Sequence, residues 1–487
     1  MATNWLAGIG ADTTLKLVFQ LGGHFFVQTG IFKMKLLELE GVSFNYGSQF
    51  TPVLQEIGLS IRTGQCHCVS GPTGSGKSSL LNLLAGVQNR PHEGDIWRHP
   101  ELITGLVMQD PQTQLLRQTV GGEVAFALEE RGISAENMLP KVQLALRHVG
   151  LFLRLDTPVS TLSLGQKYRL MIAAQLVCEP HLLLLDEPWA QLDDQGVAEL
   201  LVVLRNLIAE GMALVLVEHN AAAFAEIIQH YWQLEAGRLS TGIYTVSDTQ
   251  PIDTPVKPWG SAHVGKVLVS AEAFDFCFDG SQPLFSCPQG FQLHAGEIVT
   301  LVGDNGSGKT SLLKSLAGML NLKLRLPLKV LGRKPKLGIY GAELGLLIQR
   351  PSRQLFETSV LAEMQFSLNR FGLPKERAEQ MLVELELMEL ANQSPHKLSY
   401  GQQHLVALAS LACLQPKVLL LDDPLAGMDK HYYRKVWFLL KRLRAQGCAI
   451  LMSSHRVVEH SAVSRQLSLH NGLLTEDTVG MEERYVS

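Results

Sequence analysis

The stretch GPTGSGKSSLLNLLAG at residues 71–86 decides the fold, and it recurs as GDNGSGKTSLLKSLAG at residues 303–318. Both copies fit the pattern GxxxxGK[ST], follow a short apolar run and lead into a helical pattern, which is the context that a phosphate-binding loop requires. Glycines let backbone amides approach phosphate oxygens, and the N-terminus of the following helix favours an anion. The sequence therefore predicts two nucleotide-binding loops in one chain.

The side chains of these loops have predictable tasks. The lysine of the pattern reaches the β- and γ-phosphates, and the next hydroxyl ligates Mg²⁺. A chance glycine-rich turn is the plain alternative for one copy, but two copies in register make coincidence negligible. The predicted phosphate-binding residues are Gly71, Gly74, Ser75, Gly76, Lys77, Ser78, Ser79, Gly303, Asn305, Gly306, Ser307, Gly308, Lys309, Thr310 and Ser311, with Ser78 and Thr310 also predicted as metal ligands.

A repeat organises the whole chain. LSLGQ (162–166) recurs as LSYGQ (398–402), LLLLDEP (182–188) as VLLLDDP (418–424), and VEHN (217–220) as SSHR (453–456). All three pairs are separated by the same interval along the chain, so the two halves are collinear. In each half, short apolar runs that end at glycine-rich or acidic motifs alternate with longer amphipathic segments, a pattern typical of an α/β fold with parallel strands buried on both faces.

The repeat and the local composition predict the domain boundaries. We expect a first domain at 34–243, an exposed linker at 244–265 within a stretch rich in Pro, Thr, Ser and Asp, and a second domain at 266–480. Residues 1–33 are interpreted as an N-terminal extension, and Met34 is a candidate for the true start.

Composition excludes several classes of protein. The net charge of −4 in 487 residues gives no basic footprint, so no nucleic-acid partner is expected. None of the seven cysteines forms a CxxC pair with zinc-ligand spacing, which suits free thiols in a reducing cytoplasm. No apolar stretch reaches the roughly 18–20 residues of a membrane span.

Two apolar runs end in acidic pairs. Asp186 and Asp422 are predicted to hold Mg²⁺, directly or through water. Glu187 and Asp423 are the predicted catalytic acids that orient and polarise the attacking water. Aspartate is one methylene shorter than glutamate, so we expect the Asp423 carboxylate to sit back from that water. For either pair alone, a solvated acid at a strand end is an equal alternative, but the neighbouring phosphate loops favour catalysis.

The motifs LSLGQ and LSYGQ resemble the LSGGQ motif of ATP-binding-cassette (ABC) proteins, and both precede their acidic pairs by the same interval. The resemblance implies two tandem P-loop NTPase domains, each with a mainly parallel sheet, an antiparallel β subdomain and a helical subdomain. It also implies that the motif starts a helix and contacts the γ-phosphate bound to the opposite domain, as a hydroxyl and amides at a helix N-terminus can. The matching nucleotide-binding residues are Ser163, Gly165, Gln166, Ser399, Gly401 and Gln402, whereas Leu164 and Tyr400 depart from the motif.

Other positions match the ABC pattern in pairs. Tyr46 and Phe278 lie equally far before their phosphate loops and resemble the aromatic that stacks on adenine, although a single aromatic is more often a core residue. The remaining pairs resemble the Q-loop glutamine that senses Mg²⁺, the switch histidine that contacts the γ-phosphate, and the D-loop aspartate. They are Gln109 and Gln349, His219 and His455, and Asp193 and Asp429.

The segments 109–130 and 349–368 resemble the stretch after the Q-loop in ATPases of energy-coupling-factor (ECF) importers, with Arg350 as a departure. These importers bring vitamins and transition-metal ions into prokaryotic cells. The resemblance implies a fused ATPase that uses ATP and Mg²⁺ and is peripheral on the cytoplasmic face of the cell membrane. Its implied partners are an integral-membrane scaffold and a membrane protein that captures the substrate.

Head-to-tail pairing of the two domains would create two composite sites. Site one combines the first phosphate loop with Ser399 and Gly401, and site two combines the second loop with Ser163 and Gly165. Because site one has Glu187 where site two has Asp423, we expect site one to hydrolyse ATP faster. Two alternatives stay open: a twin-cassette ATPase of a sugar importer, and a soluble ATPase acting on ribosomes or DNA, which the short, nearly uncharged linker disfavours.

Overall fold

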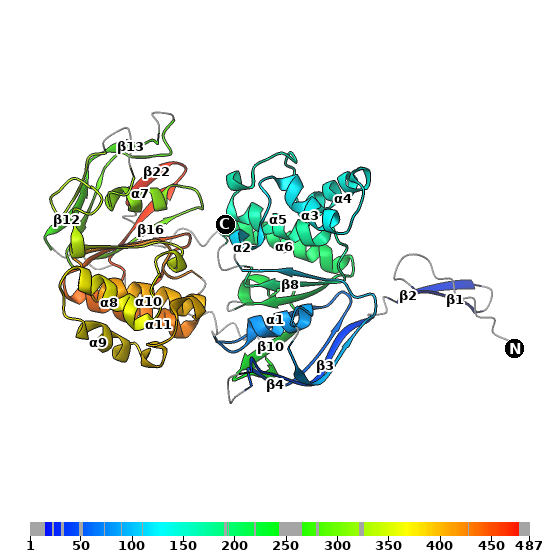
Figure 1. The fold of residues 1–487 in the computed structure, drawn as a ribbon. Coiled ribbons are helices and arrows are strands. Elements are labelled where there is room, and N and C mark those ends of the chain that lie inside the picture. The colour runs from blue at the N-terminus through cyan, green and yellow to red at the C-terminus, as the bar shows by residue number, and fades with distance from the viewer. Residues whose placement is uncertain are drawn as a thin grey trace.

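A computed structural model describes residues 15–21, 24–30, 34–47, 52–72, 74–88, 90–109, 111–188, 192, 194–218, 221–242, 265–278, 282–320, 326–426 and 428–476. Figure 1 shows the two halves of the repeat as two units of helices and sheets beside each other. Within the predicted N-terminal extension, β1 (Leu15–Leu21) and β2 (His24–Gly30) form an antiparallel hairpin of their own. The predicted linker lies almost wholly outside the described residues, and the domain boundaries stay predictions.

A six-stranded sheet with the order β11-β10-β5-β9-β8-β7 forms the centre of the first half. The strands from β10 to β7 run parallel, and β11 is antiparallel to β10. Their bounds are β5 (Cys66–Ser70), β7 (Thr104–Val107), β8 (Leu182–Asp186), β9 (Ala213–Val217), β10 (His230–Glu235) and β11 (Arg238–Thr241). A separate antiparallel sheet has the order β4-β3-β6, with β3 (Lys35–Phe44), β4 (Leu54–Arg62) and β6 (His92–Arg98).

The second half repeats this plan. Its eight-stranded sheet has the order β13-β14-β22-β21-β16-β20-β19-β18, and the strands from β21 to β18 run parallel. Their bounds are β13 (Phe274–Phe276), β14 (Phe285–Cys287), β16 (Ile298–Gly303), β18 (Leu344–Leu347), β19 (Val418–Leu421), β20 (Ala449–Ser454), β21 (Arg465–His470) and β22 (Leu473–Glu476). The antiparallel sheet β15-β12-β17 contains β12 (Val267–Ala271), β15 (Phe291–His294) and β17 (Leu328–Val330).

Helices connect these strands and cover the sheets (Figure 1). The first half has α1 (Lys77–Ala85), α2 (Pro111–Gln114), α3 (Val120–Glu130), α4 (Ala135–His148), α5 (Leu164–Leu176) and α6 (Asp194–Ala209). The second half has α7 (Lys309–Leu316), α8 (Val360–Arg370), α9 (Glu376–Glu384), α10 (Tyr400–Ala412) and α11 (Lys430–Ala445). The predicted α/β class with two P-loop NTPase units is confirmed. None of the described helices is long and apolar enough to cross a membrane.

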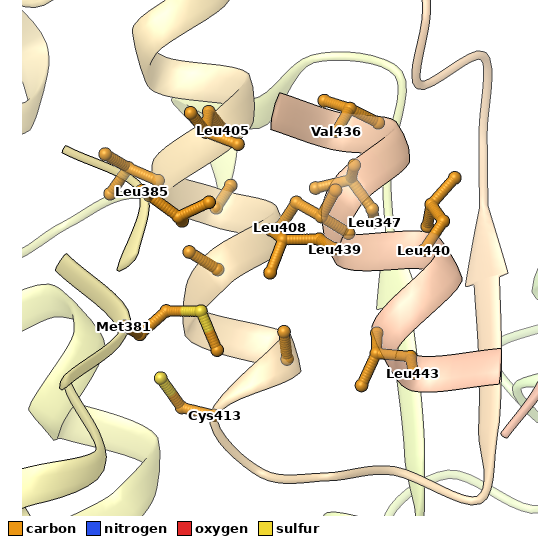
Figure 2. Packing of buried hydrophobic residues seen from close by; sticks show 14 of the residues in the cluster. Leu347, Met381, Leu385, Leu405, Leu408, Cys413, Val436, Leu439, Leu440 and Leu443 are labelled. Carbon is orange, nitrogen blue, oxygen red and sulfur yellow. The ribbon is translucent and has the colours of Figure 1, made fainter. Parts of the chain in front are cut away.

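The central strands are buried on both faces, as their apolar runs predict. In β8, Leu182 and Leu184 belong to the core on one face, and Leu183 and Leu185 to the core on the other. The four leucines are fully buried. In the second half the same alternation joins β19 to two cores, one of which packs α10 against α11 (Figure 2). This burial fixes the carboxyl ends of the strands, where the acidic pairs lie.

Candidate nucleotide-binding and hydrolysis sites

The phosphate loops are backbone turns that only glycine can form. A Cβ on Gly71 would lie 2.1 Å from the carbonyl oxygen of Leu234, and one on Gly303 would lie 2.4 Å from that of Leu469. Gly76 and Gly308, with φ of 102° and 112°, precede α1 and α7 as left-handed N-caps. L-residues with a side chain rarely adopt this conformation, so the loop geometry depends on glycine.

The loop lysines lie over their own loops. The Lys77 Nζ donates to the carbonyl oxygens of Gly71 and Pro72 at 2.8 and 3.0 Å. The Lys309 Nζ donates in the same way to Gly303 and Asp304, at 2.6 and 2.8 Å. Burial lowers the pKa of the Lys77 ammonium, and nearby carboxylates, Glu187 first, oppose that shift. Each loop therefore has a positive charge at its centre.

The hydroxyl and the aspartate predicted to hold Mg²⁺ are brought together in both halves. The Ser78 Oγ donates to Asp186 Oδ2 at 3.3 Å, and the Thr310 Oγ1 donates to both Asp422 oxygens at 3.0 and 2.8 Å. Burial raises the pKa of Asp422, while the hydrogen bonds from Thr310 and Ser453 act in the opposite direction. A hydroxyl beside a carboxylate is the donor set that Mg²⁺ takes alongside substrate phosphates.

Polar atoms without partners also fit a bound nucleotide. The Oγ atoms of Ser75 and Ser307 are buried in the phosphate loops and have no hydrogen-bond partner among the described residues. The His455 Nε2 shares that state. Buried polar atoms are normally paired, so these three would suit the phosphate oxygens of a bound nucleotide. Mg²⁺, when bound, would be held by Ser78 with Asp186 and by Thr310 with Asp422, and would neutralise charge on the β- and γ-phosphates.

The predicted catalytic acid of the first half accepts a hydrogen bond from the predicted Q-loop glutamine. Glu187 follows β8 with a φ of 47°, a conformation uncommon for a residue with a side chain. The Gln109 Nε2 donates to Glu187 Oε2 at 2.6 Å. The two residues were predicted separately as catalytic acid and as metal sensor, and the fold joins them. A signal that moves the Q-loop can therefore change the orientation of the catalytic carboxylate.

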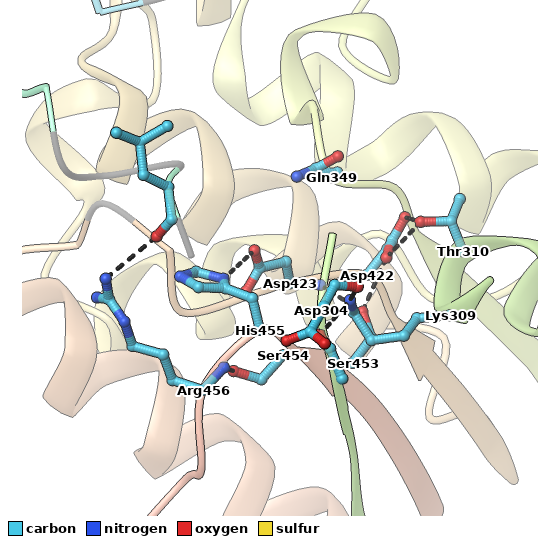
Figure 3. Close-up of polar contacts among 12 residues, drawn as sticks. Asp304, Lys309, Thr310, Gln349, Asp422, Asp423, Ser453, Ser454, His455 and Arg456 are labelled. Atoms are coloured by element: carbon cyan, nitrogen blue, oxygen red, sulfur yellow. Dashed lines mark hydrogen bonds and ion pairs between the residues drawn. The ribbon is translucent and has the colours of Figure 1, made fainter. Parts of the chain in front are cut away.

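In the second half a histidine lies beside the predicted catalytic acid. Asp423 has the same left-handed backbone, with a φ of 50°, but its Oδ2 lies 3.1 Å from the Nδ1 of His455. No hydrogen bond joins Gln349 to Asp423 among the described residues, and Figure 3 shows Gln349 lying away from this pair. Ser453, which sequence analysis missed, donates to Asp422 and accepts from the Asp423 amide at 2.8 and 3.0 Å.

The LSxGQ motifs begin helices, as predicted. Ser163 caps α5 and Ser399 caps α10, each in a capping box with the glutamine three residues later, Gln166 or Gln402. This reciprocal pair satisfies amides at the helix start. A Cβ on Gly165 would meet the Cα of Gly196 at 3.6 Å, and one on Gly401 would meet the Tyr432 ring at 3.2 Å. The contact at Gly165 is therefore an ordinary van der Waals distance, whereas the glycine at 401 permits a closer approach of α11.

The predicted adenine-stacking aromatics lie exposed near the phosphate loops. The Tyr46 hydroxyl lies 3.0 Å from the Ser79 Oγ, and the Arg90 guanidinium lies 5.5 Å from the Tyr46 ring centroid. Phe278 is 46% exposed and meets Phe276 edge-on. Arg90 was not predicted, because a lone arginine carries no pattern. In the first half, the Arg90 guanidinium lies beside the face of the Tyr46 ring, and a positive charge there suits a nucleotide.

Some predicted residues do not take part in a described contact of the site. His219 and Asp193 lie outside the described residues. Asn305 and Gly306 lie in the exposed turn of the second loop, and Gly74 is the left-handed counterpart in the first loop. The Ser311 carbonyl accepts from the Ser315 Oγ within α7.

Interactions cross between the halves near both sites. Asp429, which caps α11, lies close enough to Lys77 for its charge to oppose the lowering of the ammonium pKa by burial. The Arg456 Nη2 donates to the carbonyl oxygen of Leu192 at 3.1 Å. These contacts place Asp429 near the first phosphate loop and Leu192 against Arg456, which follows His455. The pairing of Ser163 and Ser399 with the opposite phosphate loops stays a prediction.

The fold and the paired sites define a P-loop nucleotide hydrolase with two nucleotide-binding units. The protein family described as "ABC transporter" matches this chain at residues 54–190 and 288–426, which together make up more than half of the chain. This chain therefore belongs to the ABC transporter family, as an ATPase with two ABC domains. It hydrolyses ATP and uses Mg²⁺.

Similar proteins extend over nearly the whole chain. A Methanosarcina acetivorans protein named "Putative ABC transporter ATP-binding protein" is 26% identical over 480 residues, covering 91% of this chain and 90% of the relative. A Bacillus subtilis protein named "Putative HMP/thiamine import ATP-binding protein YkoD" is 29% identical over 482 residues, covering 86% and 87%. A solved structure described as "Model of ribosome-bound archaeal Pelota and ABCE1" covers 89% of this chain and 78% of its own, with a TM-score of 0.64 and 19% identity. At that identity the likeness concerns the fold alone.

Proposed function

We propose that this chain is the ATPase subunit of an ECF-type importer for a vitamin or a transition-metal ion, working at the cytoplasmic face of the membrane. The observation that carries the proposal is the pair of segments after the Q-loop glutamines, 109–130 and 349–368. The proposed partners are an integral-membrane scaffold and a membrane protein that captures the substrate.

The polar residues of these segments hold the loop in one shape. Gln114 accepts from the Met108 amide and donates to the Leu106 carbonyl, both at 2.8 Å. Gln354 makes the same two bonds in the second half, at 2.9 and 2.8 Å. β7 and β18 are edge strands, and each glutamine bonds one backbone group within its strand and one just after it. The Q-loop therefore leaves each sheet in a fixed direction.

Buried glutamates complete the support. Glu123 Oε2 accepts from the amides of Leu116 and Arg117 at 2.9 and 2.6 Å, and Glu363 Oε2 accepts from those of Phe356 and Glu357, both at 2.8 Å. Both glutamates are buried, and hydrogen bonds to a charged acceptor are the strong ones. The segments that resemble ECF ATPases, 109–130 and 349–368, thus each contain a surface loop that is held in place by side-chain hydrogen bonds.

These two hydrogen-bonded loops hold apolar side chains at the surface. Leu116 is 67% exposed, and Phe356 is 58% exposed and packs edge-on against the partly exposed Phe366 at 4.6 Å between ring centroids. Large exposed apolar side chains on a rigid support are typical of a partner interface. They lie a few residues from Gln109 and Gln349, so a scaffold bound here would sense the state of the nucleotide sites.

Coupling would follow from these contacts. Closure of the two halves around ATP would bring the LSxGQ helices to the phosphate loops, and Glu187 would orient the attacking water. Because Gln109 holds Glu187, movement of the Q-loop would accompany hydrolysis and reach the docked scaffold. The resemblance to a relative named for HMP/thiamine import favours a small vitamin-like substrate.

The main alternatives use the same ATPase differently. A sugar-importer ATPase lacks support from the segments after the Q-loop. A soluble role on ribosomes rests on fold similarity at 19% identity, and the short, nearly uncharged linker does not favour it.

Isolation from membranes tests the proposal. Tagged protein is purified from detergent-solubilised membranes, and the accompanying chains are identified by mass spectrometry. A helical scaffold with a small, very hydrophobic protein is expected. Phe356→Asp should reduce recovery of both at least tenfold and leave ATPase activity of the isolated chain unchanged. Leu473→Asp is the matched control, because Leu473 is 49% exposed in β22, towards the opposite edge of the sheet from β18. Recovery with ribosomes, or without a membrane protein, would contradict the proposal.

A further inference from the structure

Arg456 reaches across from one half of the chain to the other. It follows the predicted switch histidine, and its guanidinium donates to the carbonyl oxygen of Leu192, 264 residues earlier in sequence (Figure 3). The Arg456 amide is itself tied to the Ser454 Oγ at 3.1 Å. The backbone of Arg456 is thus fixed within the second half, and its side chain binds the backbone of the first half.

The acceptor side of this contact is firmly anchored. Leu192 is 1% exposed and belongs to the main core of the first half. Its Cδ2 would lie 3.9 Å from a Cβ on Gly165, the glycine of the first LSxGQ motif. A close-packed core transmits displacement of one residue to its neighbours. The position of the Leu192 carbonyl is therefore linked to the position of Gly165.

The donor side is anchored in the other wall of the same site. His455 contacts the carboxylate of Asp423, and Ser453 contacts Asp422 and the Asp423 amide. These residues and the second phosphate loop form one side of site two, and Gly165 is predicted to lie on the opposite side. The Arg456 hydrogen bond therefore joins the segment next to the second phosphate loop to the segment that packs against Gly165.

The repeat provides a different residue at site one. The residue that corresponds to Arg456 is Asn220, and the one that corresponds to Leu192 is Met428. An asparagine amide ends three bonds earlier than an arginine guanidinium and carries no charge. The long, charged donor of this contact therefore belongs to site two.

We propose that Arg456 is a positioning residue that latches the two halves together at site two and sets the distance between Gly165 and the second phosphate loop. Loss of this bond leaves site one intact and loosens site two. The proposal concerns ATP hydrolysis, which does not depend on the importer function proposed above.

Single-site backgrounds test it. Arg456→Ala is placed in a Glu187→Gln chain, where hydrolysis reports site two, and in an Asp423→Asn chain, where it reports site one. We expect a further loss of about 3- to 10-fold in the first background, as for one hydrogen bond, and less than 2-fold in the second. Arg456→Lys should recover part of the loss, and Arg456→Asn should match alanine. Arg370→Ala, an exposed arginine at the end of α8, is the control.

A second readout separates positioning from general damage. With a non-hydrolysable ATP analogue bound, Arg456→Ala should raise hydrogen exchange at 164–167, the start of the first LSxGQ helix, and leave 400–403 unchanged. Equal losses of hydrolysis in both backgrounds, or equal exchange at both helices, would overturn the proposal. So would unchanged hydrolysis in the Glu187→Gln background.

Discussion

The two predicted catalytic acids occupy corresponding places, and the described contacts of their carboxylates differ. Glu187 and Asp423 both follow a buried strand with a left-handed backbone, but Glu187 accepts from Gln109 of the Q-loop, whereas Asp423 pairs with His455. The comparison teaches that a repeat can keep its backbone at both acids while the described side-chain contacts around them differ.

The two halves also differ at the helix position that corresponds to Tyr168 in the first half and to His404 in the second. In the first half the Tyr168 hydroxyl donates to the Asp186 carbonyl at 3.4 Å. The corresponding His404 is 1% exposed, and neither ring nitrogen has a hydrogen-bond partner among the described residues. Burial lowers the pKa of His404 to about 4, against a smaller opposing effect of Asp423. The second half therefore contains a buried histidine, which titrates in the acidic range, where the first half has a buried tyrosine.

The largest expected difference is a pH dependence of stability confined to the second half. His404 has a folded-state pKa of about 4, below its usual 6.5, so the unfolded chain takes up the proton first as the pH falls. Its contribution to stability is complete above pH 6.5 and is lost towards pH 4, by about 3 kcal/mol in all. Urea midpoints of α10, followed by hydrogen exchange, should fall between pH 7 and 5. His404→Gln should flatten that slope, and Tyr168→Phe should leave it unaltered; an unchanged slope in His404→Gln would refute this assignment.

The next difference concerns hydrolysis. Glu187→Gln should lower total ATPase activity about 10- to 100-fold, because the remaining site relies on the shorter acid. Asp423→Asn should lower it less than 2-fold. Steady-state ATPase rates at saturating ATP and Mg²⁺ check both variants. Equal losses would show that the two sites contribute alike and would break the comparison.

A reciprocal exchange sharpens the result. Asp423→Glu adds the missing methylene, so its carboxylate should reach the Gln349 side as Glu187 reaches Gln109, and total activity should rise about 2-fold as site two approaches the rate of site one. The rise is best measured in the Glu187→Gln background, where it should be about 10-fold or more. If activity stays flat there, the contact with His455 and Ser453, rather than acid length, limits site two.

The smallest expected effect lies in the helices that carry the LSxGQ motifs. Arg169 of α5 pairs with Glu199 of α6 at 2.7 Å, and its side chain is 12% exposed. The second half has the fully buried Leu405 in place of Arg169. Glu199→Gln should cost less than about 1 kcal/mol, because the glutamate is 39% exposed and solvent screens the pair. The shift in the urea midpoint of the first half measures this cost. A loss as large as that of breaking a buried ion pair would contradict the expectation.

Much of the fold could be predicted from local patterns. The phosphate loops, the buried parallel strands and the helices that begin at Ser163 and Ser399 depend on short-range rules of backbone geometry and burial, which act within a few residues. The pairing of Ser78 with Asp186 and of Thr310 with Asp422 followed because the phosphate loop and the acidic pair both lie at carboxyl ends of strands in one parallel sheet.

Contacts between distant segments could not be predicted. The amino-acid pattern gives Ser453 no sign of its bonds to the acidic pair, and it gives Arg456 no sign of its bond to Leu192. Gln109 and Glu187 were assigned separate tasks, although one amide group joins them. Such contacts depend on strand order and on the exact reach of a side chain.

The sequence by itself determined that this protein is a repeated P-loop ATPase with glutamate at one predicted catalytic position and aspartate at the other, because these properties reside in residue types at fixed local spacing. Only the tertiary structure decided which partner holds each acid and where the two halves touch. The physical reason is that hydrogen bonds form over about 3 Å between atoms hundreds of residues apart, and only the folded backbone brings those atoms within that distance.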